Sequence, residues 1–318
     1  MSSNSHLLVG QFDNGHSDSF DTGLTTVSSS RKSNILPTIY LTNCNHILNK
    51  LDELYLLAID NSNDLEILCL SETWLDDFTP DSVCALPGFK TYRKDRATGQ
   101  GGGVLCYVHN DIVTLSAQIN FGSSVDIIDG FSTSNFEVLW LLLRPKIMPR
   151  PFSQLIIVTV YCPPWYEVAR KRALQKFITI GLDKLLCLHP NAAVVVLGDF
   201  NTLDTSFLSR HFGFRQLVKA GTRGDRILDK MYTNCHTLYD EAVICAPLGR
   251  SDHKSVVVRS PWSKRVPVGR KTVTKRDFSG DVYNCIESDL LKVNWSTMYR
   301  LDRCQDQANF FMKQCVLQ

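Results

Sequence analysis

The chain alternates between short apolar runs and polar segments from residue 35 onward. Runs rich in Val, Ile and Leu predict strands at 65–72, 103–108, 136–143, 154–161, 192–199, 241–247 and 254–260. Apolar residues at helical spacing predict a helix over 46–59, and a longer one is predicted over 166–186. Because the strands are almost continuously apolar, both faces of their sheets should be covered. The pattern predicts an α/β domain of packed sheets with outer helices, from 35 to 261.

The segments on either side of this domain have a different composition. Residues 1–34 are rich in Ser, Asn, Asp and Gly and are expected to form a disordered leader. Residues 262–276 carry Lys and Arg but no acid, and we predict a basic linker. This linker is either a solvated tether or an arm that contacts phosphates through Lys264 and Arg265. Residues 277–318 are expected to be a helical tail, the start of a truncated connecting region.

Composition narrows the class of protein only moderately. The 318 residues are 44% hydrophobic and 21% charged, as in a soluble globular protein, and the net charge of +2 does not itself indicate a nucleic-acid partner. The 11 cysteines are odd in number and lack CxxC spacing, so buried reduced thiols in an intracellular protein are expected. There is no signal-peptide pattern and no apolar run near the roughly twenty residues of a membrane span, so no membrane partner is expected.

Polar side chains stand where the predicted strands begin or end. The members of this set are Asn43, Glu72, Tyr161, Asp199, Asn201, Asp229, Asp252 and His253. Any one of them is readily explained as a turn former or a helix cap. Because α/β sheets gather such strand ends on one rim, the whole set predicts a site there. Asn43 shares strand parity with Ile39 and Leu41 and should point toward the core.

The chemistry of this set favours metal-assisted hydrolysis of a phosphate ester. A carboxylate such as Glu72 with further oxygen ligands suits Mg²⁺, whereas the absence of clustered Cys and His argues against zinc. A His with two Asp nearby can act as a base or be held cationic. Asn and Tyr supply neutral donors for a phosphoryl oxygen.

The order of the motifs resembles a known family. The blocks are "TNCNHILNKLDEL", "LCLSETWL", "YRKDRATGQGGGVLCYV", "VYCPP", "VVVLGDFN", "GTRGDRILDKMYTN" and "LGRSDHKSV". Together they resemble the endonuclease/exonuclease/phosphatase superfamily, which includes DNase I and the apurinic/apyrimidinic endonucleases. More narrowly, residues 35–261 look like the endonuclease domain of a non-LTR retrotransposon polyprotein. The resemblance implies a four-layer α/β sandwich, two packed β-sheets flanked by helices, with the active site at one end.

The resemblance also implies a role for each residue of the set. Glu72, Asn43 and Asp252 would hold Mg²⁺, with Mn²⁺ as the alternative. Asp199 would align or deprotonate the attacking water, and Asn201 would stabilise the charge that develops on phosphorus.

On the substrate side, Tyr161 would contact the scissile phosphate, and His253, oriented by Asp229, would bind or protonate a phosphoryl oxygen. The glycine-rich block 94–103 should form a hairpin whose Arg96 contacts DNA, unless it is a plain tight turn.

Two positions depart from the family pattern, since Asn45 and Cys162 stand where members commonly carry Arg. Their loss is expected to weaken the grip on the DNA backbone or the salt bridges behind the site. The chain also stops where a polyprotein would continue toward a reverse transcriptase, so a truncated copy is expected.

Three hypotheses remain open. The first is a Mg²⁺-dependent DNA endonuclease that nicks one strand and leaves a 3′-hydroxyl, with double-stranded DNA as its partner and the nucleus as its location. In a longer polyprotein, element RNA or a reverse transcriptase would be further partners. The second is a phosphatase or phosphodiesterase of the same fold, acting on small or lipid phosphate esters. The third is an inactive decayed copy that still binds nucleic acid.

Overall fold

The computed structural model describes residues 33–34, 36–59, 64–97, 99–117, 119, 121, 125–260, 263–264 and 280–316. The chain divides into two compact units, which are described separately. One unit is 31–266, and the other combines 1–30 with 267–318. The predicted disordered leader lies outside the described residues except for Ser33–Asn34, and the predicted basic linker except for Ser263–Lys264. These two segments pair with each other as short strands.

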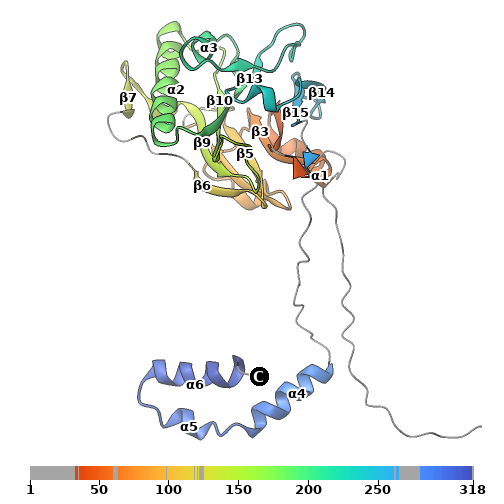
Figure 1. The fold of residues 1–318 in the computed structure, drawn as a ribbon, viewed down its shortest axis with the longest axis vertical. Coiled ribbons are helices and arrows are strands. Elements are labelled where there is room, and N and C mark those ends of the chain that lie inside the picture. Colours follow the sequence, from red (N-terminus) through yellow and green to blue (C-terminus); the bar gives the residue numbers. More distant parts are fainter. Residues whose placement is uncertain are drawn as a thin grey trace, which may run out of the picture. The chain divides into compact units, whose positions relative to one another are not determined.

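Two six-stranded mixed sheets form the centre of the 31–266 unit (Figure 1). The first sheet has the order β14 (Val243–Pro247), β15 (Lys254–Val258), β2 (Thr38–Asn43), β3 (Leu65–Ser71), β5 (Val104–His109) and β4 (Phe89–Lys94). The second has the order β12 (Arg215–Gln216), β13 (Asp229–Thr233), β11 (Ala192–Asp199), β10 (Gln154–Tyr161), β9 (Glu137–Arg144) and β6 (Val113–Ala117). Small two-stranded pairs join β1 (Ser33–Asn34) to β16 (Ser263–Lys264) and β7 (Ile127–Ile128) to β8 (Phe131–Ser132).

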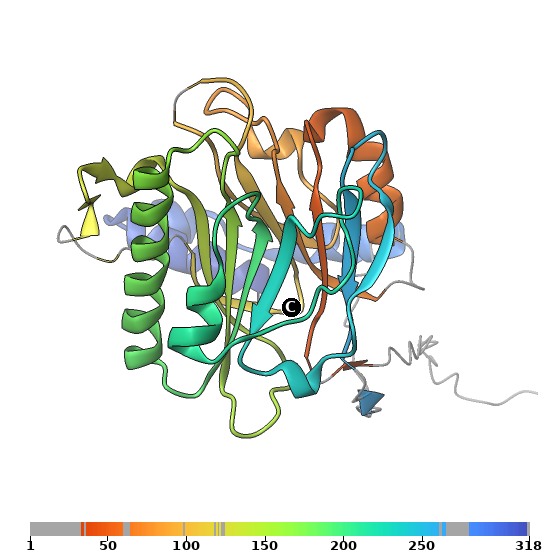
Figure 2. The ribbon, with the colours of Figure 1, turned by 90° about the horizontal axis from the view of Figure 1, so that it is seen from above.

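The two sheets pack face to face, and helices cover their outer faces (Figure 2). Helices α2 (Val168–Leu188) and α3 (Ser206–Phe212) lie against the second sheet. Helix α1 (Leu51–Ile59), preceded by a 3-10 turn at Ile47–Lys50, packs on the outer face of the first sheet. The predicted four-layer sandwich is therefore confirmed.

Strand β11 shows why its sequence is apolar without alternation. Ala193, Val195 and Leu197 point into the core between the sheets. Val194 and Val196 point the other way and pack beneath α2. Because side chains alternate across a strand, a strand covered on both faces needs apolar residues at every position. All eight residues of β11 are buried accordingly.

The second unit is helical where it is described. It contains α4 (Gly280–Lys292), α5 (Ser296–Tyr299) and α6 (Cys304–Val316). Trp295, directly before α5, contacts the rings of Phe310 and Phe311 in α6. In the described part of the chain, no helix is long and apolar enough to cross a bilayer. The described cysteines are free thiols, most of them buried, with Cys187 and Cys304 exposed.

Candidate active site

Four ionisable side chains lie in one row across the second sheet. The strand register places Tyr161 opposite Glu137 on one side and opposite Asp199 on the other, and Asp199 opposite Asp229. Strands β10 and β11 end at this rim, whereas the antiparallel strands β9 and β13 begin there. Along each of these strands, the residue in the row lies an even number of positions from the core residues that face the first sheet. Its side chain therefore also points toward the first sheet, and the row lies at one end of the core between the sheets.

The first sheet contributes Asn43 and Glu72 to the same end. Parallel pairing sets Asn43 beside Ser71, so Glu72 follows directly at the edge. Glu72 has a left-handed backbone (φ 53°), which turns the chain away from the strand. Its Oε1 accepts a hydrogen bond of 2.7 Å from the Tyr161 hydroxyl. Burial, followed by the charge of Glu72, raises the pKa of Tyr161, so this hydroxyl remains a neutral donor.

Asp199 is held by donors from two segments. Its Oδ2 accepts hydrogen bonds from Asn43 Nδ2 at 3.0 Å and from Asn201 Nδ2 at 3.1 Å. Its Oδ1 accepts one from the Asn201 backbone N–H at 2.9 Å. Burial and then the charge of Asp229 raise the pKa of Asp199 to about 7, against the opposing effects of His253 and these donors.

Gly198, one residue before Asp199, has no room for a side chain. Its φ is +143°, and a Cβ built there would lie 1.8 Å from the carbonyl oxygen of Val160. Glycine therefore permits the close approach of β10 and β11 that places Tyr161 next to Asp199.

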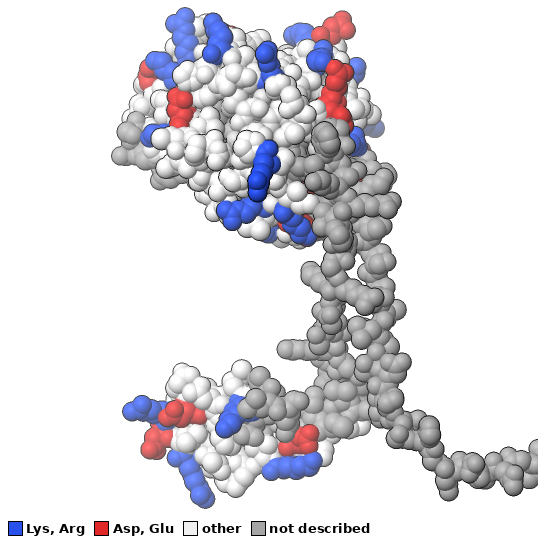
Figure 3. All heavy atoms as spheres, in the orientation of Figure 1, with Lys and Arg blue, Asp and Glu red and all other residues white. Residues whose placement is uncertain are grey.

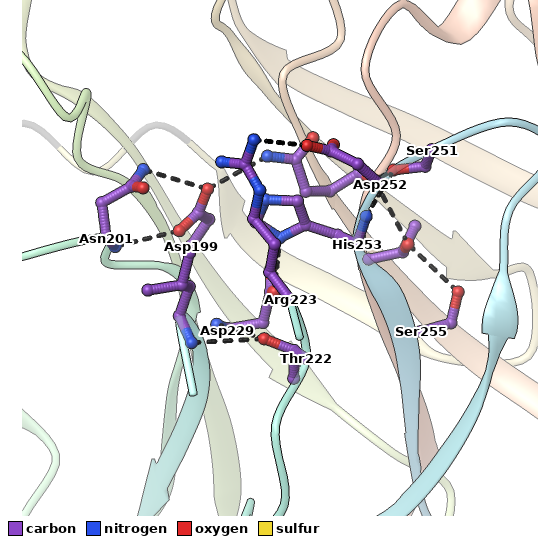
Figure 4. Close-up of polar contacts among 12 residues, drawn as sticks. Asp199, Asn201, Thr222, Arg223, Asp229, Ser251, Asp252, His253 and Ser255 are labelled. Carbon is purple, nitrogen blue, oxygen red and sulfur yellow. Dashed lines mark hydrogen bonds and ion pairs between the residues drawn. The ribbon is translucent and has the colours of Figure 1, made fainter. Parts of the chain in front are cut away.

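His253 and Asp229 form a buried pair (Figure 4). His253 Nδ1 lies 2.7 Å from Asp229 Oδ2, so Nδ1 carries the hydrogen and Nε2 is left for the substrate. Burial alone would lower the pKa of His253, but its hydrogen bond to Asp229 and the nearby carboxylates, Asp229 first, raise it. Thr222 Oγ1 accepts the Asp229 backbone N–H at 3.1 Å and so fixes the start of β13.

The turn before β15 is fastened to the end of β2. Ser251 Oγ donates to the Asn43 carbonyl at 2.6 Å and accepts the His253 N–H at 3.2 Å. Asp252, between them, points outward and forms an ion pair with Arg223 at 2.5 Å, each side chain about half exposed (Figure 4).

Three buried side chains have the composition of a metal site. Asp199, Asp229 and His253 each offer one ligand atom, and these atoms all lie within 4.8 Å of one another. Asp229 Oδ1 is buried and has no hydrogen-bond partner among the described residues, so a cation or a polar substrate atom would satisfy it.

The structure brings together most of the residues that the sequence selected. Hydrogen bonds join Asn43, Asp199 and Asn201, join Glu72 to Tyr161, and join Asp229 to His253. Arg96 lies next to this group, with its guanidinium 5.8 Å from the centre of the Tyr161 ring. Lys264 falls in β16 without a described side chain, and Arg265 lies outside the described residues.

Sequence reasoning missed several residues of the site, namely Glu137, Thr222, Arg223 and Ser251. Glu137 is buried and its Oε1 accepts from Arg96 Nε at 2.9 Å. Its signal was present, since a charged residue begins the apolar strand "EVLWLLLR". Because the predicted strand covers 136–143, Glu137 falls inside it and does not count among the polar residues at strand boundaries.

The comparisons with known proteins agree with this geometry. A model of the Endonuclease/Exonuclease/phosphatase family matches residues 42–253, from the end of β2 to His253. The chain belongs to this family. It is therefore a phosphodiester hydrolase of the endonuclease/exonuclease/phosphatase type, a family whose members are typically metal-dependent. The search of curated proteins gives no match.

Solved structures of the same fold are distant in sequence. The human nocturnin catalytic domain matches at 16% identity and TM-score 0.52, covering 71% of this chain and 94% of that one. The 3′ phosphatase NExo from Neisseria matches at 15% identity and TM-score 0.53, covering 71% and 100%. The AP endonuclease LMAP from Leishmania major matches at 14% identity and TM-score 0.52, covering 71% and 88%. At these identities the matches establish the fold alone.

Proposed function

We propose that this chain is a Mg²⁺-dependent endonuclease that nicks one strand of double-stranded DNA, of the type found in non-LTR retrotransposon polyproteins. One observation carries the proposal most directly. Glu72, from the edge of the first sheet, accepts a hydrogen bond from Tyr161 of the second, and Asn43 of the first sheet donates one to Asp199 of the second. The proposed metal-binding carboxylate and the proposed base are thus both held at the same rim.

The donor set fits a hard cation. Glu72 and Asn43 offer carboxylate and amide oxygens from adjacent parallel strands, and oxygen ligands are the ones that Mg²⁺ prefers. Asp252 is the third residue that we assign to this side, after release from Arg223. When bound, Mg²⁺ would polarise a phosphoryl oxygen and offset charge in the transition state.

The remaining residues move protons and orient the phosphate. Asp199, with its pKa raised to about 7, accepts a proton from the attacking water near neutral pH. Asn201 and Tyr161 are neutral donors that we assign to the phosphoryl oxygens, since burial keeps the Tyr161 hydroxyl protonated. To donate there, Tyr161 exchanges its hydrogen bond to Glu72, and Asn201 exchanges one of its bonds to Asp199 or the Cys162 carbonyl. His253, held by Asp229, binds a phosphoryl oxygen as a cation through Nε2.

Three further observations favour DNA over small phosphate esters. The ordered motifs of residues 35–261 resemble retrotransposon endonuclease domains more than other branches of the family. Figure 3 shows Lys and Arg side chains spread over the visible face of the 31–266 unit with only a few acids, which suits an extended polyanion. Finally, the NExo structure, of the same fold, is bound to a product DNA hairpin. We accordingly place the active protein in the nucleus, with element RNA or a reverse transcriptase as partners in a longer polyprotein.

Supercoiled plasmid incubated with the full chain and Mg²⁺ tests the proposal. Relaxed circles with 3′-hydroxyl ends, absent with EDTA, are the expected result. Unchanged plasmid together with phosphate release from small esters would assign the chain to the phosphatases of the same fold. Unchanged plasmid and unchanged esters, with DNA still bound, would identify an inactive copy.

A further inference from the structure

A cavity of about 300 Å³ lies at the Glu137 end of the row of ionisable side chains. The residues that matter most in its lining are Arg96, Gln100, Asn135, Glu137, Trp165 and Arg170. They come from the glycine-rich hairpin between β4 and β5, the start of β9 and the first turn of α2 with the residues before it. Of these lining residues only Arg96 is expected from the sequence to contact DNA, and the proposed catalytic and metal-binding residues are not part of the lining.

The hairpin is built around the guanidinium of Arg96. Arg96 Nε donates to Glu137 Oε1, and its NH1 donates to the Gln100 carbonyl at 2.8 Å. A Cβ at Gly102 would lie 2.2 Å from Arg96 NH2 and 2.5 Å from Glu137 Oε2, and Gly102 has φ +74°. Only glycine leaves space for the guanidinium in this backbone conformation. Arg96 therefore occupies a fixed position beside Tyr161, 5.8 Å from its ring centre.

Two guanidinium N–H groups at this cavity lack an acceptor. Arg96 NH2 and Arg170 Nε are buried and have no hydrogen-bond partner among the described residues. Burying such donors unsatisfied is costly. Because both nitrogens are covered in this structure, an anion in the cavity satisfies them once it displaces the atoms that cover them. The Arg170 guanidinium is fixed against the ring of Tyr166 at 4.1 Å, so it too is oriented in advance.

An exposed aromatic ring stands at the same place. Trp165 is 65% exposed, which is unusual for the largest apolar side chain. The Arg96 guanidinium lies 5.0 Å from its ring centre, so one face of the indole is supported by a cation. A flat exposed ring next to unpaired guanidinium donors has the chemistry of a nucleotide site, because bases stack on indole and phosphates pair with arginine.

We propose that this cavity is a subsite for the nucleotide that flanks the scissile phosphodiester. Its phosphate accepts hydrogen bonds from Arg96 and Arg170, and its base stacks on Trp165. Glu137 holds Arg96 in place while leaving the pair of arginines with a net positive charge. The subsite rests on the proposed endonuclease function and adds to it a determinant of DNA binding that is independent of base identity.

Binding of a fluorescent duplex DNA 16-mer to the full chain in EDTA tests the subsite without cleavage. Trp165→Ala should weaken binding about fivefold or more and leave the salt dependence unchanged. A base stacked on an aromatic ring is worth about 1–3 kcal/mol on a single strand, and part of this offsets the cost of taking the base out of the duplex stack. Arg170→Ala should weaken it about tenfold or more and reduce the slope of log K against log salt by about 0.9. Trp165→Phe and Arg170→Lys should recover part of the affinity, and Arg170→Lys the slope.

Arg172→Ala is the matched control, since it removes the same charge from an exposed position on the same helix. Thermal melting of each variant excludes misfolding. If Trp165→Ala and Arg170→Ala bind DNA as tightly as Arg172→Ala does, the subsite proposal is wrong. If the wild-type chain still nicks plasmid in that case, the endonuclease proposal stands. A wild-type chain that binds no DNA overturns both.

Discussion

Asp199 should make the metal-free protein less stable as pH rises. Its side chain is fully buried, and its pKa is raised from 3.8 to about 7, chiefly by burial. One pKa unit is worth about 1.4 kcal/mol, so ionising this carboxyl in the fold costs about 4 kcal/mol in total. A catalytic base that is poised near neutral pH is thus kept at the expense of folding stability.

The sign of the pH dependence follows from proton binding. Below pH 4 the carboxyl is protonated in both states, and its full contribution to stability is present. Between about pH 4 and pH 7 the unfolded chain releases this proton while the folded protein keeps it, so the free energy of unfolding falls. From pH 5 to pH 8 the loss that this group causes is about 3 kcal/mol.

Urea unfolding of wild type and Asp199→Asn in EDTA, at several pH values from 5 to 8, measures this effect. In wild type, Asn43 and Asn201 donate to both carboxylate oxygens of Asp199, whereas the amide of Asp199→Asn has only one oxygen that can accept. The lost hydrogen bond destabilises the variant by the same amount at every pH. The quantity to follow is therefore the free energy of unfolding of Asp199→Asn minus that of wild type. Between pH 5 and pH 8 it should shift by about 3 kcal/mol in favour of the variant. Parallel curves for wild type and Asp199→Asn would refute the reasoning, and Asp77→Asn, at an exposed aspartate, provides the control.

Three other substitutions test the site. Glu72→Gln should remove nearly all Mg²⁺-dependent plasmid nicking while circular dichroism and melting stay near wild type; an active variant that resists EDTA would contradict the metal assignment. Asp229→Asn should lower the nicking rate and move the falling limb of its pH profile to lower pH, because the carboxylate that raises the pKa of His253 is gone. An unchanged profile would leave Asp229 a structural residue. Gly198→Ala should destabilise the protein by roughly 3 kcal/mol or more in urea unfolding, because its Cβ would lie 1.8 Å from the Val160 carbonyl oxygen and the strands must separate. Wild-type stability in that variant would show that β10 and β11 tolerate the separation.

The layers of the fold were predictable because burial determines which positions of each strand or helix are apolar, and this pattern can be read within a short segment. A strand covered on both faces must be apolar at every position, as β11 is, and a helix packed on one side keeps its stripe, as Ile47 and Leu54 do. Strand order is a different matter. The neighbours of β2 are β3 and β15. The pairing of β2 with β15 depends on contacts between residues far apart in the sequence, so the composition of either strand alone does not predict it.

The site was predictable to the extent that parity and chain direction determine it. Asn43 and Asp199 continue the rows of core residues in their strands, so their side chains enter the space between the sheets and meet at 3.0 Å. Glu137 obeys the same parity rule, but it falls inside the predicted strand 136–143, and only the structure shows that the strand begins at Glu137 and at the active rim. The Arg223–Asp252 ion pair joins two loops. Loops have no helix or strand periodicity, so the sequence pattern does not predict which of their side chains meet.

The two departures from the family pattern have a structural explanation that favours an intact site. Asn45 has a left-handed backbone (φ 39°), and its N–H donates to Asn43 Oδ1 at 3.1 Å. Cys162 is fully buried, its N–H donates to the Asp199 carbonyl at 2.9 Å, and its own carbonyl accepts Asn201 Nδ2 at 3.0 Å. Both positions act on the site through backbone atoms, which every residue type supplies. The side chains at these two positions therefore do not determine the geometry around Asp199, and an arginine at either position would add positive charge rather than a catalytic group.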